Sequence, residues 1–151
     1  MVSGLLHEKT ARRLVHLLKY QGITAAGVIL GTVMAGRVPA GTTALVPVPR
    51  AAARRIRYGI DPALELAHRV GVETGIEVIS ALGAPLWWPS HAGGNRAARI
   101  RPRFRRIRPV PTGSVMVDDV FTTGSTLAAA GRILGLEKAL TATRADSRWY
   151  E

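Results

Sequence analysis

The chain has 151 residues, which indicates one domain, and its lack of cysteine excludes disulfides and cysteine-ligated zinc. With 21 Lys and Arg against 10 Asp and Glu, the formal net charge is +11. This surplus predicts anionic partners, either phosphorylated small molecules or nucleic acid. The amino-terminal residues do not resemble a secretory signal, and the longest weakly polar stretch, residues 22–36, is too short to span a bilayer. We therefore expect a cytoplasmic protein without membrane association.

The first third of the chain predicts two helices and a strand. Apolar residues at helical spacing favour an amphipathic helix over residues 5–20, which Gly22 should end, and a more buried helix over residues 23–35. The β-branched and apolar run at residues 40–48 favours a buried strand. We expect that strand to enter a basic loop, which carries Arg50, Arg54, Arg55 and Arg57.

The middle third predicts one helix, one strand and a long loop. Asp61 as N-cap and Pro62 as first helical residue favour a helix that ends near Gly71, and residues 77–82 favour a short strand. No element is convincing over residues 83–112, which hold five prolines and many arginines. A loop of this length in a compact domain is usually functional, so we expect a mobile lid there.

The last third predicts a strand over residues 114–117, a helix that Gly135 ends, and a final strand over residues 140–143. Strands that alternate with helices are typical of an α/β fold with a mainly parallel sheet flanked by helices. We therefore expect residues 1–151 to form a single domain of that class.

The segment VMVDDVFTTGST, residues 115–126, is the strongest chemical signal. A buried strand delivers two adjacent carboxylates, and a short loop then leads into a helix. Free backbone N–H groups and the positive end of the dipole make such a helix start a phosphate site. Gly124 allows close approach of an anion, and four hydroxyl groups add donors, from Thr122, Thr123, Ser125 and Thr126. The triphosphate P-loop spacing and its Lys are missing.

Asp118 and Asp119 should bind hydroxyl donors or a divalent cation, because carboxylates repel a phosphate. A ribose diol supplies the hydroxyls, and Mg²⁺ is the natural cation. Neighbouring side chains on a strand point to opposite faces, so both carboxylates can serve one ligand only if the strand ends here. Together with the phosphate loop, this pattern predicts a ribose 5-phosphate site.

The same segment resembles the phosphoribosyl pyrophosphate (PRPP) motif of the type I phosphoribosyltransferases. The resemblance implies that fold, with Asp118 and Asp119 on the ribose and Mg²⁺, and the 5-phosphate in the loop 122–126. Three further segments are similar to the ComF or GntX-like family, which is associated with DNA uptake in competent bacteria: LKYQG (18–22), LVPVPR (45–50) and HAGGNRAAR (91–99). This resemblance implies pyrophosphate contacts by Pro49, Arg50 and Arg99.

The chain departs from that family in three places. It lacks the usual amino-terminal zinc ribbon, RYGIDP (57–62) replaces an RGFNQ-type segment, and His91 and Gly94 replace Gln and Leu. The four histidines have no metal-ligand spacing, so we assign no transition-metal site. No general base or catalytic residue can be named.

The expected reaction is transfer of a 5-phosphoribosyl group to an unknown nitrogen acceptor with release of pyrophosphate. Two alternatives stay open: a PRPP-sensing regulator without turnover, and a nucleic-acid or competence adaptor on the same fold. The arginines between Arg96 and Arg108 could bind nucleic acid weakly, although few aromatic residues lie among them. Trp87 and Trp88 could cap a base or pack at a subunit interface, which leaves a homodimer open.

Overall fold

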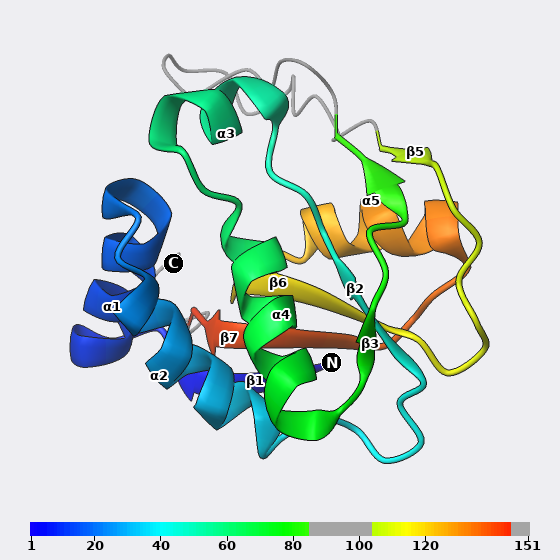
Figure 1. The fold of residues 1–151 in the computed structure, drawn as a ribbon, viewed down its shortest axis with the longest axis horizontal. Helices are drawn as coiled ribbons and strands as arrows, with labels where there is room; N and C mark the ends of the chain where they lie inside the picture. Colours follow the sequence, from blue (N-terminus) through cyan, green and yellow to red (C-terminus); the bar gives the residue numbers. More distant parts are fainter. Residues whose placement is uncertain (85–103, 146–151) are drawn as a thin grey trace.

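The computed structural model describes residues 1–84 and 104–145 (Figure 1). The helices are α1 (Lys9–Gln21), α2 (Thr24–Ala35), α3 (Ala52–Tyr58), α4 (Pro62–Thr74) and α5 (Ser125–Leu134). The strands are β1 (Val2–Leu6), β2 (Ala44–Pro47), β3 (Glu77–Val78), β4 (Leu82–Gly83), β5 (Arg105–Arg106), β6 (Val115–Phe121) and β7 (Ala139–Arg144). The predicted α/β class is confirmed for these residues.

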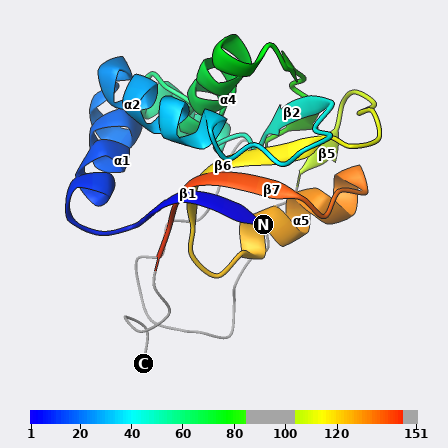
Figure 2. The same cartoon turned by 90° about the horizontal axis from the view of Figure 1, so that it is seen from below.

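Five of the strands form a parallel sheet in the order β1-β7-β6-β2-β3. Figure 2 shows this sheet nearly edge-on, with α1, α2 and α4 on one face and α5 on the other. A second, antiparallel pair is formed by β4 and β5. The sheet is therefore covered on both faces, as expected for parallel strands, which are usually buried on both sides.

Two hydrophobic clusters hold these layers together. The larger one packs α1, α2 and α4 on the sheet, and its fully buried members include Leu18, Leu30, Leu66 and Leu140. The smaller one packs α5 and the β4–β5 pair on the other face, around Val46, Met116, Leu134 and Phe104. Alternate residues of β6 enter opposite clusters, since Val117 belongs to the first and Met116 to the second.

The chain leaves the two middle strands in opposite directions. From β2 it passes through α3 and α4 to β3 at one edge of the sheet, and from β6 it passes through α5 to β7 on the other side. Because α4 and α5 cover opposite faces, β2 and β6 form a topological switch point. In open α/β sheets, ligands bind in the crevice outside the carboxyl ends of such strands.

The first predicted helix is wrong at its start. It begins at Lys9, because residues 2–6 form the edge strand β1 beside β7. A hydrogen bond of 2.7 Å joins the hydroxyls of Ser3 and Thr141 across this pair. Gly22 ends α1 as predicted, and α2 confirms the second helix.

Two further predictions, on either side of Gly59, need correction. The basic loop after β2 contains the helix α3, which buries none of its residues and so has no apolar stripe to reveal it. The helix at Pro62 continues past Gly71 to Thr74. Gly71 serves packing instead, because a Cβ there would lie 2.9 Å from the carbonyl oxygen of Ile76.

The predicted strand at 77–82 is divided between two sheets, with β3 in the parallel sheet and β4 paired to β5. The segment 83–112, predicted to lack regular structure, includes the end of β4 at Gly83 and the short strand β5 at Arg105–Arg106. Arg99 and the two adjacent tryptophans lie in residues 85–103, which are outside the described residues. Most of the predicted lid, residues 83–112, lies in the same segment. Residues 1–84 and 104–145 contain no helix that combines the length and hydrophobicity needed to cross a membrane.

Candidate functional site

The switch point brings two of the predicted segments together. The Val48 N–H donates to the Val117 carbonyl over 2.9 Å, so the chain after β2 runs beside β6 up to the acidic pair. Pro49 and Arg50 follow directly on this side. The predicted pyrophosphate segment and the predicted ribose segment thus leave adjacent strands at the same edge of the sheet.

The loop after β6 ends at Gly124, which is the N-cap of α5 and has φ +73°. A Cβ at this position would lie 2.8 Å from the Phe121 ring, so both the backbone conformation and the available space require glycine. The Ala128 N–H donates to the Gly124 carbonyl over 2.8 Å and starts the helix. The predicted helix is confirmed, and it begins at Ser125, so Ser125 and Thr126 of the predicted loop belong to its first turn.

A small pocket lies at this helix start. Asp118 and the loop residues Thr122 and Gly124 line it, together with Ser125 and Thr126 of α5. Thr123 and Ser125 are exposed, and their hydroxyls are 3.2 Å apart. The first N–H groups of a helix have no partners within the helix. Backbone N–H groups, side-chain hydroxyls and one carboxyl group therefore converge on this pocket.

The prediction that β6 ends at the acidic pair is wrong, because the strand continues to Phe121. The two carboxyl groups therefore lie on different faces of the sheet. Asp118 lines the pocket beside α5, whereas Asp119 pairs with Lys19 of α1, which covers the opposite face. Pairing with β7 extends the strand past this point, since Val120 and Phe121 lie opposite Thr143 and Arg144.

Electrostatics distinguish the two carboxyl groups. Burial, followed by the like charge of Asp119, raises the pKa of Asp118 to about 8. One Asp118 oxygen also accepts the Asp119 N–H over 2.8 Å. Lys19 lies 2.8 Å from Asp119. Burial lowers the pKa of this lysine, but the charge and hydrogen bond of Asp119, together with Asp118 and Tyr20, outweigh burial and the pKa is raised. At neutral pH, Asp118 is thus largely protonated and Lys19 is charged.

Arg50 is held at three places. Its guanidinium carbon lies 4.8 Å from the Tyr58 ring centre and 5.5 Å from that of Tyr20, which is cation–π distance. Its Nη1 donates to the Lys19 carbonyl over 2.7 Å, and its backbone N–H donates to Asp61 over 3.0 Å. Nη2 is buried without a hydrogen-bond partner among the described residues, so part of the hydrogen-bonding capacity of this guanidinium is unsatisfied there.

A histidine that the sequence did not single out also approaches the site. His7 follows β1, and its Nδ1 lies 2.8 Å from the Thr143 hydroxyl, which in turn donates to the Asp119 carbonyl over 3.5 Å. Burial and then Arg12 lower the pKa of His7. A neutral His7 therefore supports the backbone of the acidic pair through the Thr143 hydroxyl.

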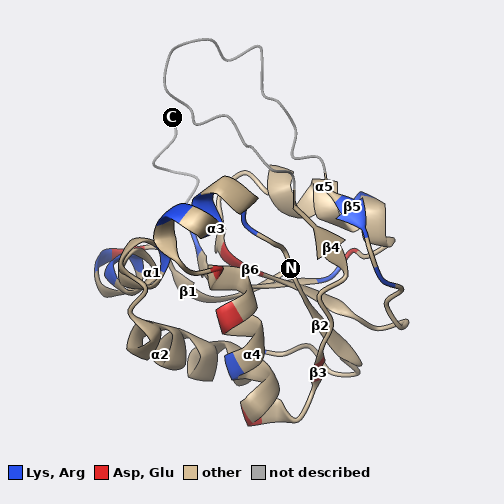
Figure 3. Cartoon of the chain, turned by 45° about the horizontal axis from the view of Figure 1, so that its top comes forward, with Lys and Arg blue, Asp and Glu red and all other residues tan. Residues whose placement is uncertain are grey.

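Sequence reasoning missed Lys19, Tyr20, Tyr58 and His7 as site residues. The LKYQG segment contained two of them, and the resemblance to a family motif was the available signal. The other predicted basic residues, Arg54, Arg55 and Arg57, are exposed on α3. Figure 3 shows basic positions on α1 and α3 around the acidic positions of β6.

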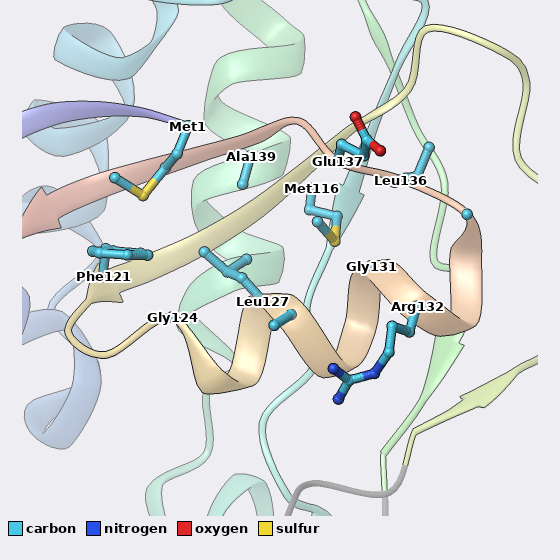
Figure 4. A pocket seen from close by; sticks show the side chains of 12 residues that line it. Met1, Met116, Phe121, Gly124, Leu127, Gly131, Arg132, Leu136, Glu137 and Ala139 are labelled. Atoms are coloured by element: carbon cyan, nitrogen blue, oxygen red, sulfur yellow. The ribbon is translucent and has the colours of Figure 1, made fainter.

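A larger groove of about 530 Å³ lies between α5 and the strands β6 and β7 (Figure 4). Its lining is mainly apolar and includes Met116, Phe121, Leu127 and Leu136. It contains neither carboxyl group of the acidic pair and none of the loop hydroxyls. Its chemistry therefore does not match the predicted phosphate site.

The acidic pair fits a cation only in part. Asp118 and Asp119 are two hard oxygen ligands, and the described residues contain no group of three His, Cys, Asp or Glu that could hold a metal ion. Mg²⁺ commonly takes one or two protein carboxylates and completes its octahedron with substrate oxygens and water. Because the two carboxyl groups lie on different faces of the sheet, the described residues would offer a cation one carboxylate, that of Asp119, and the other ligands would have to come from substrate and water.

Comparison with known proteins gave no identification. No family model matches the sequence, and no curated protein matches it. Membership of the ComF-type phosphoribosyltransferases therefore stays a prediction, and the functional argument depends on the geometry of this site.

Proposed function

We propose that this protein binds PRPP and transfers its 5-phosphoribosyl group to a nitrogen acceptor, on a fold of the type I phosphoribosyltransferase kind. The observation that carries the proposal is the pocket at the start of α5. It joins the Asp118 carboxyl group to free helix N–H groups and to the hydroxyls of Thr122, Ser125 and Thr126. Ribose 5-phosphate carries the matching groups, a phosphate and hydroxyls, on one small molecule.

The loop 122–126 would hold the 5-phosphate through N–H and hydroxyl donors. A largely protonated Asp118 removes the charge repulsion that a carboxylate would otherwise exert on that phosphate. Asp119, on the other face of β6, would accept from a ribose hydroxyl or bind the cation. Because the strand continues past the pair, the expectation that both carboxyl groups bind one ribose does not hold, and the proposal assigns Asp118 to the phosphate pocket and Asp119 to a separate partner.

Arg50 would receive the pyrophosphate, with Pro49 directing the chain from β2 toward it. Its Nη2 lacks a hydrogen-bond partner among the described residues, and the tyrosine rings orient the guanidinium. Guanidinium groups are well suited to phosphate oxygens. Arg99 belongs to the same proposal from the sequence resemblance alone.

In the proposed reaction, the bond between ribose C1 and the pyrophosphate oxygen breaks, and pyrophosphate leaves with the electron pair. A bond from the acceptor nitrogen to C1 forms, and that nitrogen loses its proton. When bound, Mg²⁺ would neutralise charge on the leaving pyrophosphate. The chain contributes positioning and charge stabilisation, since Thr122 and Thr123 offer no titratable base in the phosphate loop.

The test is a screen for pyrophosphate release from PRPP and Mg²⁺ over nucleobases and amines. A transferase releases pyrophosphate only in the presence of an acceptor, and Gly124→Ala should abolish that release. PRPP binding without release for any acceptor would favour the sensing alternative. Salt-resistant binding of nucleic acid without PRPP binding would favour the adaptor alternative.

A further inference from the structure

Asp61 is a buried acidic residue outside the acidic pair. It is 8% exposed and stands at the N-cap of α4, where the buried residues Pro62 and Ala63 begin the helix. Asp is a preferred N-cap residue, but the Asp61 side chain forms no capping hydrogen bond within the part of the chain that the structure describes. Its Oδ2 instead accepts the backbone N–H of Arg50, eleven residues earlier, over 3.0 Å. The carboxyl group therefore holds the chain that follows β2.

The arrangement is unfavourable for stability alone. Burying a carboxyl group costs free energy unless its oxygens are hydrogen-bonded, and the Asp61 Oδ1 has no partner within residues 1–84 and 104–145. Within the same residues, Arg50 Nη2 is also buried and unsatisfied. An exposed Ser or Thr would start the helix without this cost. The choice of Asp61 therefore points to a role other than starting α4.

The hydrogen bond from Arg50 to Asp61 closes a segment that packing does not hold. Between these two residues the chain forms α3, which buries none of its residues (Figure 1). The segment beyond Asp61 is anchored, because α4 buries Leu66 and Val70 in the larger cluster. Asp61 thus ties the Arg50 backbone to a helix that belongs to the core.

The guanidinium of Arg50 is held from the other side, by α1. Its Nη1 donates to the Lys19 carbonyl over 2.7 Å, and the rings of Tyr20 and Tyr58 lie at cation–π distance. Lys19 itself pairs with Asp119, so these contacts place the guanidinium near the acidic pair. The bond to Asp61 fixes the backbone end of the same residue.

We propose that Asp61 is a positioning residue for the pyrophosphate side of the site, and that it fixes the Arg50 backbone so that the guanidinium meets the pyrophosphate of PRPP. This inference rests on the proposed pyrophosphate role of Arg50. Without the bond, the segment from Arg50 to α4 can shift, and a displaced guanidinium makes a poorer contact with phosphate oxygens. Asp61 does not line the pocket at the start of α5, so the 5-phosphate should bind independently of it.

Calorimetric titration with two fragments of PRPP separates this role from a general effect on the fold. Inorganic pyrophosphate with Mg²⁺ probes the Arg50 side, and ribose 5-phosphate probes the pocket at the start of α5. Asp61→Ala should weaken pyrophosphate binding by about tenfold or more, because the main-chain anchor of Arg50 is lost. It should leave the affinity for ribose 5-phosphate unchanged within about a factor of two.

Two further variants at the same position keep the test intact if Asp61→Ala folds poorly. Asp61→Ser retains a preferred N-cap residue, but its oxygen lies one bond nearer the backbone, so it should lose pyrophosphate affinity as Asp61→Ala does. Asp61→Asn retains an oxygen acceptor for the Arg50 N–H and should bind pyrophosphate within about threefold of the unmodified protein.

Glu8→Ala is the matched control, because it removes an exposed acidic residue at the N-cap of α1. It should leave the affinities for both fragments unchanged. The double variant Asp61→Ala with Arg50→Ala tests whether Asp61 acts through Arg50. It should bind pyrophosphate no more weakly than Arg50→Ala alone, since the two substitutions remove the same contact.

Equal pyrophosphate affinity in the Asp61→Ala, Asp61→Ser and unmodified proteins would overturn the inference. An equal loss for ribose 5-phosphate, or no pyrophosphate binding by the unmodified protein, would overturn it too. Titration with PRPP and Mg²⁺ separates these failures from failure of the proposed function. PRPP binding that Asp61→Ala leaves unchanged rejects the role of Asp61 alone. Selective loss of pyrophosphate affinity, in a protein that does not bind PRPP, supports the role of Asp61 and rejects the substrate.

Discussion

Replacing Asp118 with Asn should change how stability depends on pH. The pKa of this carboxyl group is 3.8 in its ordinary state and about 8 in the folded protein, where burial and Asp119 disfavour its charge. Between these values the folded state binds more protons than the unfolded state, so the free energy of unfolding falls as pH rises. One proton corresponds to a slope of at most about 1.4 kcal/mol per pH unit.

From pH 5 to pH 7 the full effect would be about 2.7 kcal/mol, and partial solvent screening of the half-buried Asp118 reduces it to about 1–2 kcal/mol. Asp118→Asn removes this titration, so the variant should gain that much stability relative to the unmodified protein over the interval. Urea unfolding at pH 5, 6 and 7, without Mg²⁺, measures the free energy of unfolding of both proteins. The control is Glu77→Gln, at an exposed position of β3. Parallel pH profiles for Asp118→Asn and the unmodified protein would refute the reasoning.

Three substitutions test the packing around the site. Gly124→Ala should lower the free energy of unfolding by roughly 1–3 kcal/mol more than Gly41→Ala does, because both glycines have positive φ but only Gly124 lies against the Phe121 ring. Equal melting temperatures for the two variants would contradict this. Gly31→Ala should cost roughly 1–3 kcal/mol, since its Cβ would lie 2.5 Å from the Arg69 Cβ of α4, and a neutral result in urea unfolding would disprove the close approach. Arg50→Lys should keep the charge but lose about 1 kcal/mol of stability with its two cation–π contacts, and unchanged unfolding would argue against them.

Local sequence patterns predicted the elements that are determined by residues close together in the sequence. The apolar stripe of α1, the αL glycine at Gly22 and the strand–loop–helix pattern around Gly124 are each readable within about ten residues. The parallel sheet followed from the alternation of such elements. The helix α3 was missed because none of its residues is buried, so it has no apolar stripe that would distinguish it from a basic loop.

Only the part of the candidate site that lies in one contiguous motif was predictable from the sequence. The acidic pair and the hydroxyl loop are contiguous, so their spacing carried the signal. Lys19 lies a hundred positions before Asp119, and only the packing of α1 on the sheet brings the two charges together. The opposite orientation of Asp118 and Asp119 likewise depends on the pairing of β6 with β7 beyond the pair, which no local pattern expresses.

Calorimetric titration with PRPP, with and without Mg²⁺, tests the central claim most directly. The account predicts saturable binding that needs Mg²⁺ and weakens by roughly 1–3 kcal/mol in Asp119→Asn, which loses a charged hydrogen-bond acceptor. Lys138→Met, at the opposite end of β6, should bind as the unmodified protein does. Absence of binding, or unchanged affinity in both Asp118→Asn and Asp119→Asn, would contradict the assignment of a PRPP site.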